Sequence, residues 1–109
     1  MHEQLYEKLK EVARAGTVTY YSDIAPMAGL DMSLPNDRYE IGAILDDINQ
    51  DEHAEGRPLL SAVVVQKDIL RPGQGFFTMA RDMGLFTGDD EDRFYSDELR
   101  RVHDYWTKH

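Results

Sequence analysis

Apolar side chains recur at helical spacing in three stretches of the chain. Counted from the first of them in each stretch, they lie three, four, seven, eight, ten or eleven positions on, which is the period of one face of an amphipathic helix. The spacing predicts helices over residues 3–15, 37–51 and 91–107. The positions that carry it are Leu5, Leu9, Val12 and Ala13 in the first helix, Ile41, Ile44, Leu45 and Ile48 in the second, and Tyr95, Leu99, Val102, Tyr105 and Trp106 in the third.

Two shorter elements are expected between the first and second helices. Residues 17–20 are β-branched or aromatic, which favours an extended piece. Ser22 is a good N-cap and Gly29 a good stop, so a short helix is expected over 23–28. The pattern therefore predicts two consecutive helices joined by a loop.

A valine-rich stretch in the second half of the chain predicts a β-hairpin. Leu59–Gln66 lacks polar alternation, which is typical of a buried strand. The segment Pro72-Gly73-Gln74-Gly75 has strong turn chemistry, after which Phe76–Phe77 is expected to return as the second arm. A short helix over 78–86 is expected to follow the hairpin.

The order of these elements predicts an α+β fold of the winged helix-turn-helix type. Such a fold has a three-helix core with a β-hairpin wing, here followed by C-terminal helices. The helix-turn-helix pair is expected at 22–51 and the wing at 59–77, with the valine strand covering the inner face of the 37–51 helix. The chain has 109 residues, so a single domain over 1–109 is expected.

Three stretches of the chain resemble a known family. They are, in order, Gly16-Thr17-Val18-Thr19-Tyr20-Tyr21-Ser22-Asp23-Ile24-Ala25, then Ile41-Gly42-Ala43-Ile44-Leu45, and then Val63-Val64 followed by Gly73-Gln74-Gly75-Phe76-Phe77. This order resembles the DNA-binding half of the alkylguanine-DNA alkyltransferases and their non-catalytic alkyltransferase-like relatives. The resemblance implies a winged helix that binds DNA. It places Tyr21 on the family's tyrosine, which lies against the phosphate of a flipped nucleotide.

The residues that react with alkylated DNA in that family are replaced in this chain. The family's cysteine, histidine and arginine fall on Leu60, Ser61 and Ala62. The arginine that fills the gap left by a flipped base falls on Tyr39, with Arg38 one position away, about 100° round a helix. The chain has no cysteine, so it cannot form the thiolate that accepts an alkyl group. The resemblance therefore implies the fold without the alkyl transfer.

Charge is unevenly distributed along a chain with 21 acidic and 12 basic residues and a formal net charge of −9. Residues 36–56 carry only Arg38 against seven acids, whereas residues 57–81 carry four bases against Asp68. DNA binding depends on cations that neutralise phosphates, so the acidic helix opposes DNA contact and the basic wing favours it. The acidic helix suits a basic protein partner.

The sequence lacks the patterns typical of catalysis and of metal or cofactor binding. Its four histidines do not have the i, i+4 spacing of a helical zinc site. Ser61 has no glycine elbow and lies on a predicted buried strand. We therefore expect a protein that is not an enzyme and that holds no cofactor and no metal.

No membrane segment or export signal is expected. The longest near-apolar run, Leu59–Val65, has seven residues, whereas about 20 are needed to span a bilayer. The start of the chain has no basic region followed by an apolar stretch. We therefore expect a cytoplasmic protein without a membrane partner.

The sequence is compatible with two functions. The first is a non-enzymatic winged-helix binding module in a nucleic-acid-associated or regulatory assembly, with weak contact to duplex DNA through the wing. The second is an acidic adaptor for protein interaction or dimerisation, or a DNA mimic, that does not bind DNA. The aromatic stripe of the last helix predicts either packing on the first helix or a homodimer seam.

Each function has its own candidate residues. Those expected to contact nucleic acid or a partner are Tyr21, Arg38, Tyr39, Arg57, Lys67 and Arg71. The acidic face expected to meet a basic partner consists of Asp46, Asp47, Asp51 and Glu52.

Overall fold

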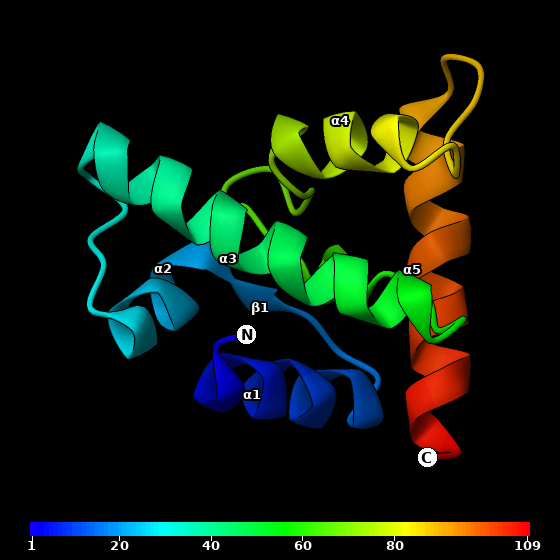
Figure 1. The fold of residues 1–109 in the computed structure, drawn as a ribbon, viewed down its shortest axis with the longest axis horizontal. Helices are drawn as coiled ribbons and strands as arrows, with labels where there is room; N and C mark the ends of the chain where they lie inside the picture. Colours follow the sequence, from blue (N-terminus) through cyan, green and yellow to red (C-terminus); the bar gives the residue numbers. More distant parts are fainter.

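The computed structural model describes all 109 residues and shows a mostly helical α+β architecture (Figure 1). Its elements are, in chain order, α1 (Glu3–Arg14), β1 (Thr19–Tyr20), α2 (Tyr21–Ile24), the 3-10 helix η1 (Ala25–Ala28), α3 (Pro35–Ala54), the 3-10 helix η2 (Leu60–Val63), β2 (Val64–Val65), α4 (Gln74–Asp82) and α5 (Glu91–Thr107). Helix α5 packs against α1, and α4 packs against α3.

The three helices predicted from apolar spacing are confirmed as α1, α3 and α5. The Nδ1 of His2 accepts a hydrogen bond of 3.1 Å from the backbone N–H of Leu5 and caps α1. Helix α3 begins at Pro35, because proline is well suited to the first helical position, where its missing N–H costs nothing. The side chain of Asp90 caps α5 by accepting from the backbone N–H of Arg93 at 3.0 Å.

The predicted β-hairpin wing over 59–77 is wrong. Strand β2 pairs in parallel with β1, with Thr19 opposite Val64 and Tyr20 opposite Val65. Phe76 and Phe77 lie in α4 and not in a strand. The physical reason is that Phe76, Phe77 and Ala80 have the i, i+1, i+4 spacing of a buried helix face, and all three are buried. A short apolar pair after a turn fits a strand and a helix equally well.

The segment with η2 and β2 forms the centre of the core. Every residue from Leu59 to Val65 is buried, and η2 contacts α1, α3 and α5. The valine-rich stretch therefore covers the inner face of α3, as predicted, although it does so mainly as a 3-10 helix. Twenty buried apolar side chains form one contiguous cluster, and five of them belong to this stretch.

The aromatic stripe of α5 is used largely inside the chain. Val102 and Trp106 are buried in the core cluster, and α5 contacts α1. Packing on the first helix is therefore confirmed, whereas a homodimer seam on this helix stays a prediction. None of the helices combines the length and apolar character that crossing a membrane requires.

Candidate functional site

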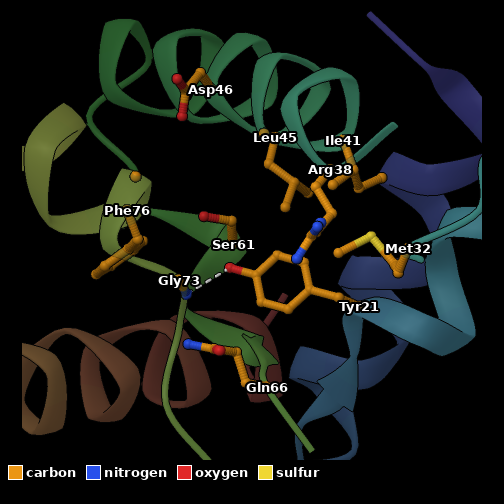
Figure 2. Close-up of a pocket in the computed structure, with 12 residues that line it drawn as sticks. Tyr21, Met32, Arg38, Ile41, Leu45, Asp46, Ser61, Gln66, Gly73 and Phe76 are labelled. Carbon is orange, nitrogen blue, oxygen red and sulfur yellow. Dashed lines mark hydrogen bonds between the residues drawn. The ribbon is translucent and has the colours of Figure 1, made fainter. Parts of the chain in front are cut away.

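A pocket of about 250 Å³ lies where α2, α3, η2 and the start of α4 meet (Figure 2). Tyr21 enters it from α2, Arg38 and Asp46 from α3, Ser61 from η2, and Gly73 precedes α4. The pocket thus brings together two sequence-predicted contact residues, Tyr21 and Arg38, with one residue of the predicted acidic face.

Tyr21 fixes the entry of α4 beside α2. Its Oη accepts a hydrogen bond of 2.8 Å from the backbone N–H of Gly73 (Figure 2). Burial raises the pKa of Tyr21, the Gly73 N–H lowers it, and the charge of Asp46 raises it. The phenol is therefore neutral at neutral pH. Its own proton has no acceptor in the chain and is free to be donated.

Ser61 and Asn49 form a buried polar pair on the inner side of the pocket. The Nδ2 of Asn49 donates to Ser61 Oγ at 2.6 Å, and the backbone N–H of Ser61 donates to Asn49 Oδ1 at 3.0 Å. An amide is not a base, so Asn49 cannot activate Ser61 as a nucleophile. The Ser61 hydroxyl can only accept from Asn49 and donate its own proton elsewhere.

Asp46 lies between this pocket and a neighbouring groove that α3 and α4 form. Its side chain lines both cavities, and Asp82 of α4 lines the groove. Burial raises the pKa of Asp46, and the negative charge of Asp82 raises it further. Two carboxylates therefore line one groove between the helices, and neither is paired with a cation.

Two of the four cations predicted to contact nucleic acid or a partner are held by carboxylates of the chain itself. Arg57 Nε donates to Glu52 Oε2 at 2.9 Å, and Arg71 pairs with Glu91 at 3.3 Å and Asp92 at 2.9 Å. The hydrogen bond to Glu52 raises the pKa of Arg57. Lys67 is exposed, and its Nζ lies 5.7 Å from the ring centre of Tyr20.

The placement of Glu52 on the outer acidic face is wrong, because its side chain is completely buried. Its carboxylate accepts hydrogen bonds from Arg57 and, at 2.7 Å, from the hydroxyl of Tyr6. Glu52 lies four positions after Ile48 and seven after Leu45, so the helical period itself places it on the inner face. That spacing was the signal for its burial.

The other predicted residues of α3 are exposed. Asp51 is free of ion pairs, and Asp47 lies 3.4 Å from the amino terminus of Met1. Tyr39 is 79% exposed and does not line the pocket. The exposed acidic face therefore reduces to Asp47 and Asp51, with half-buried Asp46 at its inner edge.

Several residues that line the pocket have no signal in the amino-acid sequence that marks them as site residues. Gln66 lines it, and its Nε2 donates to the carbonyl of Pro72 at 3.3 Å. Gly42 and Gly75 also line it, from α3 and α4. Asn49, which holds Ser61 beside the pocket, did have a signal in the sequence, because it is a polar residue four positions after Leu45 on the apolar face of a helix.

No group of three or more histidine, aspartate or glutamate side chains is placed to hold a metal ion. Comparison with protein families, with curated proteins and with solved structures gave no match.

Proposed function

We propose that this chain is a non-enzymatic binding module of a regulatory assembly and that the exposed acidic face of α3 binds a basic protein. The observation that carries this proposal is that intramolecular ion pairs occupy two of the predicted contact arginines while acids of α3 stay exposed. Arg57 and Arg71 are paired with carboxylates of the chain, whereas the acids Asp47 and Asp51 of α3 stay exposed. Asp47 pairs only with the amino terminus of Met1, and Asp51 has no cation partner. This face of α3 therefore presents negative charge to a partner.

Electrostatics favours a protein over a nucleic acid as the partner. Each phosphate contact needs a free cation, and affinity for duplex DNA changes with salt by a slope of about −0.9 for each contact. Of the four cations expected to contact nucleic acid or a partner, Arg57 and Arg71 have carboxylate partners, which leaves Arg38 and Lys67. A net charge of −9 repels the phosphate backbone and attracts a basic surface.

One observation favours a second candidate function, contact with nucleic acid. The segment α2–η1–α3 has the helix-turn-helix order that the resemblance to the alkyltransferases implies, and Tyr21 meets Arg38 at one pocket. The β-hairpin wing of that family is absent here. Any such contact would rest on Arg38 and Lys67, and we expect it to be weak and strongly salt-dependent.

Fluorescence anisotropy separates the two functions. The full chain is titrated at low salt into labelled duplex DNA, single-stranded DNA and a deca-arginine peptide. We expect binding of the peptide alone. The double variant Asp47→Lys/Asp51→Lys should weaken peptide binding about tenfold, since two close charge pairs are lost.

The matched control is Asp68→Lys/Asp104→Lys, which changes the net charge equally at exposed sites outside α3. Equal weakening by both double variants would mean that net charge, and not the face of α3, attracts the peptide. Salt-dependent DNA binding that Arg38→Gln and Lys67→Gln remove would overturn the proposal in favour of the second function.

A further inference from the structure

Arg38 is the one arginine whose guanidinium has no partner in the chain. There are eight arginines, and each of the other seven meets a carboxylate, a carbonyl oxygen or an aromatic ring. Arg38 is exposed and also lines the pocket, so its guanidinium is open to solvent and to a ligand alike. Arg38 reaches from α3 toward Tyr21 at the pocket (Figure 2). Its place there points to a partner inside the pocket.

Two positions that line the pocket are glycines although neither the backbone conformation nor steric contact demands glycine there. Gly42 lies in the middle of α3 and Gly75 in the first turn of α4, and neither has a positive φ. A Cβ at either position would meet no other atom within 4 Å. Glycine disfavours a helix relative to alanine. A bare helix surface facing a pocket is instead suited to close approach by a ligand.

The remaining wall of the pocket combines apolar surface with two hydroxyl donors. Its apolar side chains are Met32, Ile41, Leu45 and Phe76. The Oη of Tyr21 and the Oγ of Ser61 already accept hydrogen bonds from the chain, at 2.8 Å and 2.6 Å. Both protons are left for an acceptor on a ligand.

We propose that this pocket binds a small organic carboxylate with a flat apolar body. The carboxylate pairs with Arg38, and the body lies over Gly42 and Gly75 against the apolar side chains. An acceptor atom of the ligand receives the hydroxyl protons of Tyr21 and Ser61. The volume of about 250 Å³ lies just below the usual range of about 300–1,000 Å³, so the ligand has about one ring.

The charge of the surroundings favours a carboxylate over a phosphate. Asp46 lines the same pocket, and Asp82 lines the neighbouring groove. Both carboxylates repel an anion, and the repulsion of a dianion is twice that of a monoanion. A guanidinium binds a carboxylate or a phosphate through two parallel hydrogen bonds, so the charge of the ligand decides between them. Two carboxylates outweigh one guanidinium here, so a monoanion gains the contact with Arg38 at a lower cost than a dianion.

The test is an NMR titration of the full, ¹⁵N-labelled chain with benzoate, its neutral isostere benzamide, and phenyl phosphate. We expect benzoate to shift the amide signals of Gly42, Gly73 and Gly75, with a dissociation constant on the order of millimolar for so small a probe. Arg38→Gln should weaken benzoate binding about tenfold, whereas Lys67→Gln, which removes an exposed cation elsewhere, should leave it unchanged. Benzamide and phenyl phosphate should bind more weakly than benzoate.

A steric pair of variants tests the role of the bare helix surface. Gly42→Leu fills the pocket and should abolish the shifts caused by benzoate, whereas Ala43→Leu places the same side chain on the exposed next position and should preserve them. Benzamide or phenyl phosphate binding as tightly as benzoate would overturn the proposal. The proposal would also be overturned by signal shifts confined to residues outside the pocket, by no binding of benzoate, or by full binding of benzoate to Arg38→Gln. The Arg38→Gln variant keeps the proposal testable if Gly42→Leu does not fold.

Discussion

The hydroxyl of Tyr21 and the backbone N–H of Gly73 are 52 positions apart in the chain and meet in a hydrogen bond of 2.8 Å. Tyr21 opens α2, and Gly73 is the N-cap residue of α4. Because Gly73 has no side chain to cap its helix, the phenol oxygen satisfies a backbone donor at this helix start. This contact holds the two sides of the pocket together.

Replacing Tyr21 by phenylalanine removes the acceptor and keeps the ring. We expect Tyr21→Phe to lower the free energy of unfolding by about 1 kcal/mol, the usual contribution of one hydrogen bond. Urea denaturation followed by circular dichroism measures this change. Tyr39→Phe is the control, since Tyr39 is 79% exposed and makes no hydrogen bond through its hydroxyl. Equal effects of the two variants would show that the Gly73 contact does not stabilise the fold.

The pair formed by Glu52 and Arg57 predicts a larger loss. Arg57→Met leaves the fully buried carboxylate of Glu52 with only the Tyr6 hydroxyl, and removing one partner of a buried ion pair costs about 3–5 kcal/mol. We expect the lower end, because the Arg57 side chain is 25% exposed. The double variant Glu52→Gln/Arg57→Met should recover part of the loss.

Arg100→Met is the matched control for this prediction. Its guanidinium pairs with Asp97 at 3.1 Å, but both side chains are largely exposed, so its loss should cost about 0–1 kcal/mol. Urea unfolding of the three variants is compared at one pH. Similar losses in Arg57→Met and Arg100→Met would contradict a stabilising role of the buried pair.

The sequence was sufficient to predict the long helices and the burial of the valine-rich stretch. The spacing of Leu5, Leu9 and Val12 allows only one period, and that period is helical. Burial of Val63–Val65 follows from the run Leu59–Val65, in which Ser61 is the one polar residue. These features depend on residues close together in the chain, so local pattern decides them.

Pairing between distant segments could not be predicted in the same way. Strands β1 and β2 have two residues each, which is too short for a periodic signal, and their parallel pairing depends on how the helices bring them together. Likewise, the ion pair of Arg71 with Glu91 joins residues 20 positions apart. Arg57 and Arg71 were expected to be available to a partner, but carboxylates of the chain hold both of them. The sequence alone could not reveal this pairing.

Tyr6 predicts a loss of stability at alkaline pH. Burial and the hydrogen bond to Glu52 raise the pKa of Tyr6 from 10.0 to about 12. The folded chain thus binds the phenol proton more tightly than the unfolded chain, and this contribution is complete below pH 10 and disappears as the pH rises through about 12. We expect the free energy of unfolding to fall across this interval.

Urea unfolding measured through the interval tests the assignment. Burial also raises the pKa of Tyr95 to about 12, so the wild-type chain carries more than one such group. Tyr6→Phe should make the fall with pH shallower, and Tyr39→Phe should leave it unchanged. An unchanged slope in Tyr6→Phe would show that its proton is not held more tightly in the fold.

Gly42 lines the proposed pocket, yet replacing it should stabilise the fold. We expect Gly42→Ala to raise the free energy of unfolding by about 0.5–1 kcal/mol, because alanine favours a helix interior and its Cβ meets no atom within 4 Å. Gly84→Ala is the control: Gly84 has a φ of +75°, so alanine there is strained and should destabilise the chain by about 1 kcal/mol. Thermal and urea unfolding measure both changes. Destabilisation by Gly42→Ala would mean that the fold itself requires this glycine. Stabilisation would mean that Gly42 weakens α3 and that the fold does not require it, which agrees with a role of the open space in the pocket.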